Sequence, residues 1–483
     1  MRVLVVGAGI GGLAVAALLS RRHQVVVIDK NDSWGGRARE LYLNGYRFDR
    51  GPSWYIMPKL YNNFFRKLGA EDLTLIPLKK SLRVYSSKHK IDLYPNDTLN
   101  REVFEILEQG GAQKYDRFMH RSKELYDLAC KFIYEDYSKL NPDVLSVIFK
   151  NFDLLLKNTD DYVNSIFRST MARNIMKFHS VFLGDVPWRI PAFYSLLIPS
   201  YLSENVLYPK GGMYRIVDNI IRNMNNVVFL GNVKAESLNI QNGLVKNLIA
   251  TINSEIQVKF INAQNSNLPE WISIQGNQIR VDADIYIINH RKNILMQNGF
   301  DGRAPIGVFL MYLGIDTDNP DLEHHNLYFS SDTDTHYRAI DRSTHIPEDF
   351  CFYFHIPSVT DPSAAPKGKH SIMTLVPLSK NIRIDRARME RKILDKLEEL
   401  IGDFRVEQKK VLDMEDFEND YLDRSAFGLS HILSQSAMFR PKNYDTKVRN
   451  LFYVGQNTNP GIGVPLVLSS AIIVDNIIRE RYG

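Results

Sequence analysis

Short apolar runs at the start of the chain predict a strand, a helix and a second strand. Residues 3–6 read VLVV and residues 25–28 read VVVI, two β-branched runs typical of buried parallel strands. Between them, residues 13–23 (LAVAALLSRRH) are rich in Ala and Leu and predict a helix. A targeting segment could also begin with one basic residue and an apolar run, but it would not continue into a second strand that ends in an acid. We therefore expect a βαβ unit.

The rest of the chain repeats the strand pattern and adds helices. Further buried strands are predicted from apolar runs at 283–290, 307–315, 350–357, 371–378 and 451–455. The charged segment 385–402 predicts a solvent-facing helix, and the segment 105–204 mixes aromatic, Leu and Lys residues in the manner of a helical cap. No internal repeat or low-complexity linker separates these parts, so we expect interleaved domains.

The first predicted strand leads directly into a glycine-rich turn. Gly7, Gly9 and Gly12 fit G-x-G-x-x-G, in which the glycines allow a tight turn, a close approach to a pyrophosphate and helix–strand packing. Asp29 ends the second strand, where a carboxylate can accept hydrogen bonds from ribose hydroxyls. Because strand, glycines, helix, strand and acid follow in this order, we predict a dinucleotide site. Its predicted contacts are Gly7, Ala8, Gly9, Ile10, Gly11, Gly12, Asp29 and Lys30.

Two further glycine-rich segments favour FAD over NAD as the dinucleotide. Gly35-Gly36-Arg37 follows the ribose-binding acid, an arrangement typical of two-dinucleotide-domain flavoproteins. Near the C-terminus, a strand, the loop at 456–465 and a helix from about Pro465 can place backbone and a helix dipole against a flavin. The residues predicted to complete this site are Gly35, Gly36, Arg37, Gly51, Pro52, Val233, Gly455, Gly461, Gly463 and Val464.

Both ends of the chain thus point to one cofactor, and the predicted fold class is α/β. We expect a discontinuous Rossmann-type FAD-binding domain, an interleaved mixed β-sheet substrate domain and a helical membrane-facing cap. The predicted divisions are 1–75 plus 205–300 plus 415–483 for FAD, 76–104 plus 301–414 for substrate, and 105–204 for the cap.

Composition narrows the functional classes. A net charge of +5 over 483 residues, without a Lys/Arg stripe, argues against a nucleic-acid partner. Two distant cysteines exclude a disulfide framework and favour a cytosolic protein. The twelve histidines show no metal-binding spacing, and the adjacent His324 and His325 would point to opposite faces of a strand, so we expect no metal. The longest interior apolar segment, 190–203, contains two prolines and is too short to span a membrane.

Several motifs resemble those of bacterial-type carotenoid desaturases, the phytoene and dehydrosqualene desaturases within the wider flavin amine-oxidase group. They are GAGIGGL, GGRA, FDRGPSW, PKGGMY, FLMYLGID, HHNLYFSSD, IPSVTDPSAAPKGK, SAFGL, FRPKN and VGQNTNPGIGVPLVLSSA, in family order over nearly the whole chain. Some of them lean toward the dehydrosqualene branch. The chain departs from the family at Asn459, where the C-terminal loop usually carries a histidine.

This resemblance implies a peripheral enzyme on the inner face of the cell membrane. Such enzymes pass a hydride from an allylic CH2 of a long isoprenoid to FAD while the neighbouring carbon loses a proton, and oxygen or a quinone then reoxidises the flavin. The protein must orient the hydrocarbon and exclude water, so we expect a long apolar tunnel open to the membrane surface.

The sequence offers no clear base for the proton. Glu204 and Asp185 flank the proline-containing segment and are the weak candidates, while the flavin or water in the tunnel remain alternatives. The alternative activities on this scaffold are oxidation of terminal methyl groups and carotenoid isomerisation. A carotenoid-binding protein without activity is disfavoured because the demanding phosphate glycines and Asp29 are intact.

Overall fold

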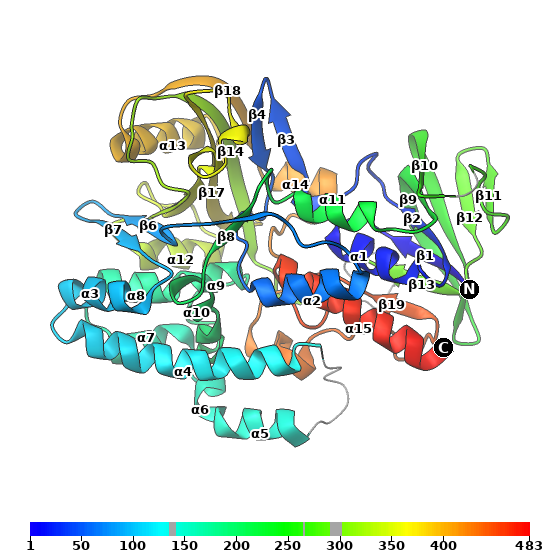
Figure 1. Cartoon of the computed structure of the whole chain (residues 1–483), viewed down its shortest axis with the longest axis horizontal. Helices are drawn as coiled ribbons and strands as arrows, with labels where there is room; N and C mark the ends of the chain where they lie inside the picture. Colours follow the sequence, from blue (N-terminus) through cyan, green and yellow to red (C-terminus); the bar gives the residue numbers. More distant parts are fainter. Residues whose placement is uncertain (135–141, 264–265, 290–301) are drawn as a thin grey trace.

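The computed structural model describes residues 1–134, 142–263, 266–289 and 302–483, and two β-sheets dominate it (Figure 1). His290, the last residue of one predicted strand, lies outside the described residues. The N-terminus and the C-terminus lie at the same end of the molecule, beside the eight-stranded sheet.

The eight-stranded sheet contains the predicted βαβ unit. Its order is β11-β12-β10-β9-β2-β1-β13-β19, and the five strands from β9 to β19 are parallel. The bounds are β1 (Arg2–Val6), β2 (Gln24–Ile28), β9 (Val227–Gln241), β10 (Leu244–Ile261), β11 (Ile272–Gln275), β12 (Gln278–Val281), β13 (Ile285–Ile288) and β19 (Leu451–Tyr453). The central strands are buried on both faces, as their continuous apolar runs predict.

Helices from distant parts of the chain cover this sheet. Helix α1 (Ile10–Leu19) packs against α15 (Val464–Tyr482) and α11 (Arg215–Arg222), and α2 (Pro58–Leu68) also contacts α15. Every residue of α1 is buried, because other helices close over its outer face. The N-terminal and C-terminal segments therefore form one layer, as expected for a discontinuous Rossmann-type fold.

The seven-stranded sheet is mainly antiparallel, with the order β18-β14-β17-β16-β15-β6-β7. Its strands are β6 (Leu82–Tyr85), β7 (Lys90–Leu93), β14 (Ile306–Asp316), β15 (His325–Tyr328), β16 (Phe352–His355), β17 (Lys369–Ser379) and β18 (Arg405–Leu412). Strand β15 pairs in parallel with β6, which brings the segment near residue 85 into a sheet built mostly from residues after 305. Helix α13 (Arg386–Ile401) buries Met389, Ile393 and Leu397, a four-residue repeat that faces this sheet.

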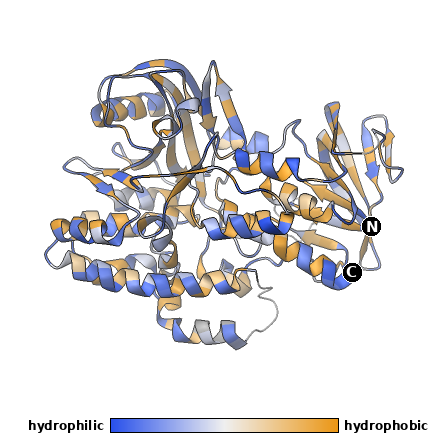
Figure 2. Ribbon diagram, viewed as in Figure 1, coloured by the Kyte–Doolittle hydropathy of each residue, from blue (hydrophilic) through white to orange (hydrophobic). Residues whose placement is uncertain are grey.

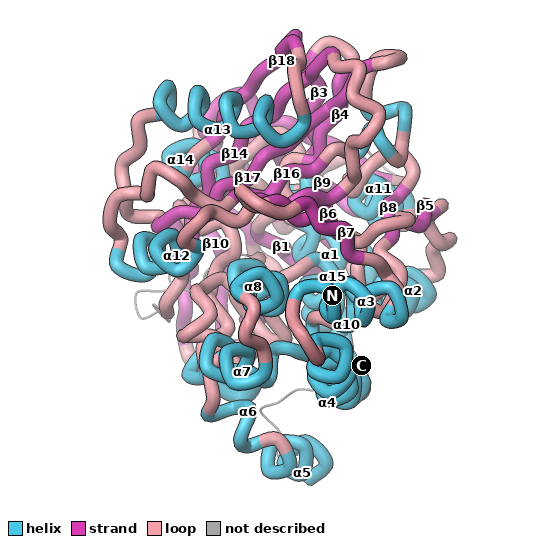
Figure 3. Tube along the Cα trace, turned by 90° about the vertical axis from the view of Figure 1, so that its left-hand side faces the viewer, coloured by secondary structure: helices cyan, strands magenta, loops and turns pink. Residues whose placement is uncertain are grey.

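Helices occupy the segment that was expected to form the cap (Figures 1 and 3). They are α4 (Gly111–Phe132), α5 (Pro142–Lys150), α6 (Phe152–Leu156), α7 (Thr159–Ile166), α8 (Thr170–Lys177), α9 (His179–Phe182) and α10 (Pro199–Leu202). Helix α3 (Asp97–Leu107) precedes them and crosses the expected boundary at 104/105. In Figure 2 the central strands of both sheets are mostly apolar, whereas the outer strands and α4 carry polar and apolar residues together. Within the described parts of the chain, no helix is long and apolar enough to cross a membrane.

Short elements connect these layers. The strand pairs are β3 (Glu40–Leu43) with β4 (Tyr46–Asp49) and β5 (Leu75–Pro77) with β8 (Leu207–Pro209). Helix α12 (Thr333–Arg342) packs on β17, and α14 (Met414–Tyr421) contacts β14 and β18. The chain after α14 then turns toward the eight-stranded sheet.

Candidate active site

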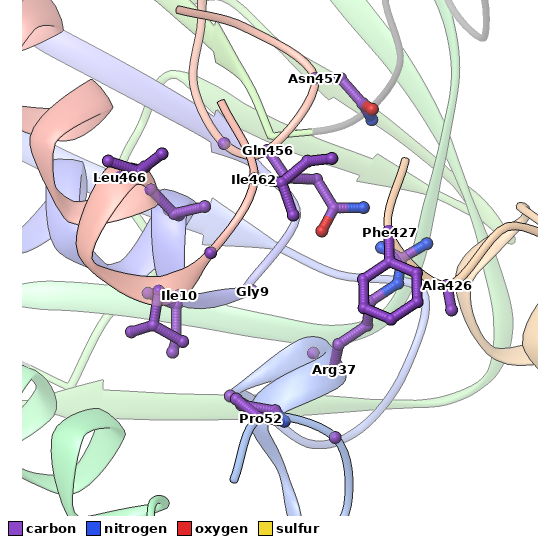
Figure 4. Close-up of a pocket in the computed structure, with 18 of the residues that line it drawn as sticks. Gly9, Ile10, Arg37, Pro52, Ala426, Phe427, Gln456, Asn457, Ile462 and Leu466 are labelled. Carbon is purple, nitrogen blue, oxygen red and sulfur yellow. The ribbon is translucent and has the colours of Figure 1, made fainter. Parts of the chain in front are cut away.

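A cavity of about 520 Å³ lies where the two sheets and the helical segment meet. One end is lined by the turns that follow β1 and β2, and the other by aromatic and aliphatic side chains from the helices and the seven-stranded sheet. Figure 4 shows Gly9, Ile10, Arg37, Pro52, Gln456 and Leu466 around one part of it. Segments from both ends of the chain therefore share one cavity.

The first glycine-rich turn has the shape that a dinucleotide needs. Gly7 has φ of +98°, a conformation that favours glycine, and a Cβ on Gly12 would lie 2.0 Å from the Gly7 carbonyl oxygen. No side chain caps the N-terminus of α1, so its first N–H groups and its positive dipole end are directed at the cavity without an internal anion. Of the residues predicted here, Gly7, Gly9, Ile10 and Gly11 line the cavity.

Ala8 and Gly12 lie behind this turn. The backbone N–H of Ala8 donates to Asp29 Oδ2 over 2.7 Å, while Gly12 packs the helix on the strand. Asp29 Oδ1 accepts from the backbone N–H of Asn31 at 2.8 Å, and burial raises the pKa of the Asp29 carboxyl group. Asp29 and Lys30 line the cavity, and so does Val233, whose N–H donates to the Asp29 carbonyl.

The second glycine-rich turn faces the segment 420–427, which was expected in the FAD domain but whose residues were not predicted to belong to the site. Arg37 Nη2 donates to the Ser425 carbonyl at 3.0 Å and lies 3.5 Å from Asp423 Oδ2, and its guanidinium lies over the Tyr421 ring. Asp420 forms ion pairs with Arg39 and Arg50 in the same region. Cavity-lining residues of this segment are Asp420, Tyr421, Leu422, Asp423, Ala426 and Phe427. Nothing in its local sequence pattern indicated contact with residues almost 400 positions away.

One buried arginine, Arg440, holds the C-terminal loop (456–465) through backbone carbonyl groups. Arg440 donates to the carbonyl oxygens of Leu429, Gln456 and Thr458, and burial lowers the pKa of Arg440 to about 10. Gln456 lines the cavity, and its buried Nε2 has no hydrogen-bond partner among the described residues. A buried amide group that lacks a partner and lines the cavity can donate a hydrogen bond to a polar atom of a ligand there.

The predicted residues of this loop divide into two groups. Gly455, Gly463 and Val464 line the cavity together with Gly35, Gly36, Gly51 and Pro52. Gly461 instead makes room for a neighbour, because a Cβ there would lie 2.3 Å from the His431 ring. Asn459, the departure from the carotenoid desaturase pattern, is buried and is not among the cavity-lining residues. Asn459 in place of the family's histidine therefore changes the packing inside the C-terminal loop, and the residues of the cavity wall stay the same.

The opposite end of the cavity is aromatic. Trp54 lies edge-on to Tyr201 at 6.0 Å between ring centroids and contacts Phe182. Aliphatic residues from the helices and from the seven-stranded sheet complete the wall, among them Met57, Leu196, Leu197, Val308, Leu310, Leu375 and Leu412. This end can hold a hydrocarbon out of water.

Residues from three sequence motifs form a buried polar network behind this wall. Asp49 accepts from the Tyr208 hydroxyl at 2.6 Å and from the Met213 N–H at 2.8 Å. Arg47 forms a 2.8 Å ion pair with Asp361, and both side chains are almost fully buried. Burial raises the pKa of the Asp49 carboxyl group. The FDRGPSW, PKGGMY and TDPSAAPKGK motifs thus meet in space and fix the segment that carries Trp54.

The two candidate carboxylates lie outside the cavity lining. Asp185 is fully buried and forms a bidentate ion pair with Arg303, with N–O distances of 2.6 and 3.0 Å. Glu204 Oε2 accepts from the Tyr126 hydroxyl at 2.9 Å, and Lys59 lies 3.8 Å away. These ion pairs and hydrogen bonds explain why the carboxylates of Asp185 and Glu204 lie where they do.

The adjacent histidines do not point to opposite faces of a strand, and that expectation was wrong. His324 lies in the bend before β15, so its ring turns toward His325, with centroids 4.5 Å apart. His355 pairs with His325 across β16 and β15, and one ring nitrogen from each of the three histidines lies within 4.8 Å of the others. His325 also stacks on Trp54, with centroids 3.9 Å apart and an interplanar angle of 2°.

Comparisons with known proteins identify the families that the chain resembles. Residues 5–68 match the NAD(P)-binding Rossmann-like domain, and residues 320–474 match the flavin containing amine oxidoreductase family. The carotenoid 3,4-desaturase of Haloarcula japonica is 30% identical over 97% of this chain and 96% of its own length. The 4,4'-diapophytoene desaturase (4,4'-diaponeurosporene-forming) of Staphylococcus aureus strain Newman is 27% identical over 99% of both chains.

Solved structures show the same fold at lower identity. An oxidoreductase from Methanosarcina mazei superposes with a TM-score of 0.61 at 17% identity, covering 98% of this chain and 99% of the other. Cyclohexylamine oxidase from Brevibacterium oxydans IH-35A gives a TM-score of 0.58 at 14% identity over 99% of both chains.

Proposed function

Because the chain belongs to the carotenoid desaturases, within the flavin-containing amine oxidoreductases, we propose that it introduces double bonds into phytoene or dehydrosqualene. It is an FAD-dependent oxidoreductase that acts on CH–CH groups of a carotenoid-type isoprenoid. The observation that carries the choice of a long linear substrate is the single cavity that joins a dinucleotide cradle to an aromatic, aliphatic compartment.

The residues at the cradle end fit FAD. The uncapped N-terminus of α1 and the turn at Gly35 and Gly36 would hold the pyrophosphate, Asp29 the ribose hydroxyls, and Gly463 with Val464 the flavin ring. When bound, FAD supplies the acceptor for the hydride. Arg37 would exchange part of its contact with Ser425 and Asp423 for phosphate oxygens.

The rest of the cavity wall orients the hydrocarbon and excludes water. Trp54, Phe182 and Met57 present apolar surface on the side that continues from Pro52. Among the described residues, none of those that form this aromatic wall carries a carboxylate, so the hydrocarbon meets no negative charge there. Isolation from water protects the cationic character that a carbon acquires as hydride leaves it.

We place the enzyme on the inner face of the cell membrane, with α5 and α6 toward the lipid. Phe149, Phe152 and Leu156 are exposed by 75%, 53% and 64%, and the exposed Lys150 and Lys157 lie beside them. In Figures 1 and 3, α5 and α6 project from the helical layer on the side away from the seven-stranded sheet. Apolar side chains next to lysines are typical of an interfacial segment, and the anionic lipid surface is its partner.

The proposed division into three domains is supported by the two sheets, although α3 crosses the boundary at 104/105 and β5 the boundary at 75/76. We propose 1–75 plus 205–300 plus 415–483 for FAD, 76–104 plus 301–414 for substrate and 105–204 for the cap. Strands β1, β2, β9 to β13 and β19 fall in the first unit, and β6, β7 and β14 to β18 in the second. The boundary at 300/301 lies outside the described residues.

An anaerobic reaction tests this proposal. The FAD-loaded protein is mixed with liposomes that hold phytoene or dehydrosqualene, and flavin absorbance is followed together with polyene absorbance. Flavin bleaching with matching new polyene bands supports desaturation, and the faster substrate identifies the natural chain length. Mixing the reduced enzyme afterwards with oxygen or with a quinone identifies the electron acceptor.

A later step in the carotenoid series is the second candidate function. The relative from Haloarcula japonica is named a carotenoid 3,4-desaturase, a name that specifies neither phytoene nor diapophytoene. Bleaching by an already conjugated carotenoid, without bleaching by the two colourless substrates, would favour this later step or a terminal-methyl oxidation. Isomerisation would change the polyene bands without net flavin reduction.

A further inference from the structure

We infer that Tyr353 accepts the proton lost by the substrate and passes its own phenol proton to His325. The inference rests on the desaturation proposed above and supplies the proton acceptor that the sequence did not reveal. Tyr353 lies on β16 and lines the cavity, so it is the catalytic residue. His325 acts through Tyr353 and is a positioning residue.

The hydrogen bonds of Tyr353 define the route. Its hydroxyl oxygen lies 2.6 Å from His325 Nδ1 and 2.9 Å from the Ser53 hydroxyl, and Ser53 also lines the cavity. His325 is 1% exposed, and stacking on Trp54 fixes the orientation of its ring. Burial, with the neighbouring His324 and His355, lowers the pKa of His325 well below its usual value. The imidazole is therefore neutral and one of its nitrogens has a free lone pair.

A path from His325 toward the surface lies directly behind it. His355 Nε2 is 2.9 Å from His324 Nε2, and His324 Nδ1 is 2.7 Å from the Thr360 hydroxyl. Thr360 is half-buried, so it reaches solvent. His325 Nε2 has no hydrogen-bond partner among the described residues, and a nitrogen of each histidine lies within 4.8 Å of the others. A small movement of the His325 ring would bring its Nε2 within hydrogen-bond distance of a nitrogen of His355 or His324.

The transfer balances in atoms and electrons. Bound FAD would supply the acceptor for the hydride of one allylic carbon, and the neighbouring carbon loses a proton to Tyr353 Oη. The electron pair of that second C–H bond becomes the new C=C bond. At the same time the Tyr353 O–H bond breaks toward His325 Nδ1, so the phenol ends the step neutral. Because burial lowers the pKa of His325, the charged ring holds the proton only transiently, and its Nε2–H passes on toward His355 and His324.

Other titratable groups on this side of the cavity lack such a connection. Tyr194 and His431 also line the cavity and lie 2.8 Å apart at the hydroxyl and Nδ1, but His431 Nε2 accepts from the Ile462 N–H. The neutral His431 ring therefore carries its proton on Nδ1, donates it to the Tyr194 hydroxyl, and cannot receive the proton of Tyr194. The Tyr201 hydroxyl is buried without a hydrogen-bond partner among the described residues, and it has no group to receive its proton. His179 lines the cavity and is a competing acceptor, which the experiment below includes.

Stopped-flow reduction of the FAD enzyme by substrate in liposomes compares the acceptor variants. In Tyr353→Phe the rate of flavin reduction is expected to fall about 10²–10⁴-fold, the usual contribution of a positioned general base, with FAD content and KM unchanged. His325→Gln should show a similar loss in kcat. Tyr328→Phe is the control. Tyr328 lies on β15, the strand paired with β16, and its hydroxyl donates to Asp349 outside the cavity lining, so this variant should keep the wild-type rate.

A wild-type rate in Tyr353→Phe would overturn the inference, and so would a loss confined to His179→Gln. Nitrogen-15 NMR of histidine-labelled protein provides a readout independent of turnover, with the His325 signals assigned by their absence in His325→Gln. An unprotonated Nδ1 that shifts in Tyr353→Phe supports the transfer, whereas a proton on Nδ1 contradicts it. If the wild-type enzyme bleaches with no carotenoid precursor, the proposed function fails while the NMR result still decides the relay.

Discussion

The exposed apolar residues of α5 and α6 give the most direct test of membrane binding. We expect the triple variant Phe149→Ser, Phe152→Ser and Leu156→Ser to bind anionic vesicles much more weakly than the wild type does. Each such side chain gains about 1.5–3 kcal/mol when it is fully buried. Their exposed fractions of 75%, 53% and 64% leave most of that gain available to the lipid interface.

Insertion of the three side chains is therefore worth about 3–6 kcal/mol, or two to four powers of ten in the vesicle partition coefficient. Co-sedimentation at increasing lipid concentration measures this coefficient directly. Because the three residues are exposed, the free energy of unfolding should change little, and FAD content should stay the same.

Ile106→Ser is the matched control. Ile106 is 85% exposed on α3, away from α5 and α6 in Figures 1 and 3, so it should not contact the lipid. Two results would refute the reasoning: a triple variant that binds vesicles as tightly as the wild type, or an equal loss in Ile106→Ser. Unchanged binding in the triple variant, together with wild-type binding that disappears when anionic lipid is replaced by neutral lipid, would instead assign the binding to Lys150 and Lys157.

Three further predictions concern the cofactor turn, the C-terminal loop and the buried histidines. Gly12→Val should abolish most FAD binding and lower the free energy of unfolding by about 3 kcal/mol, because its Cβ would collide with the Gly7 carbonyl, and flavin absorbance after gel filtration would show it. Asn459→His restores the residue usual in the family below the loop. It should lower stability by about 1–3 kcal/mol through overpacking yet leave the rate of flavin reduction nearly unchanged, and a large gain in rate would show that residue 459 reaches the substrate. Burial lowers the pKa values of His179 and His336 to about 4, so these residues stay neutral in the folded protein while the unfolded chain binds protons below about pH 6.5. The free energy of unfolding should therefore fall between pH 6.5 and 4 by about 1.4 kcal/mol per pH unit for each histidine, and His336→Gln should flatten that slope in guanidinium titrations; equal stability at pH 7 and 5 would contradict it.

The fold could largely be predicted from local patterns. Continuous β-branched runs, the glycine turn and the Ala/Leu helix indicated β1, α1 and β2, because these elements depend on contacts between neighbouring residues in the sequence. The C-terminal helix was expected from about Pro465 and begins at Val464, since Pro at the first turn is a local signal. Asp29 was expected to end the second strand, and it follows β2 directly, with its carboxylate bonded to the Ala8 N–H.

The sequence by itself therefore determined the Rossmann unit with its glycine turn and, through family motifs, the kind of substrate. Only the tertiary structure decided what completes the cavity. Asp423 and Ser425 reach Arg37 across almost the whole chain, and no local pattern encodes that contact. Likewise, Tyr353 meets His325 because β15 and β16 pair at one particular register, and a shift of one residue would turn both side chains to the other face. Long-range strand pairing, which depends on the packing of the complete sheet, thus placed the proton acceptor.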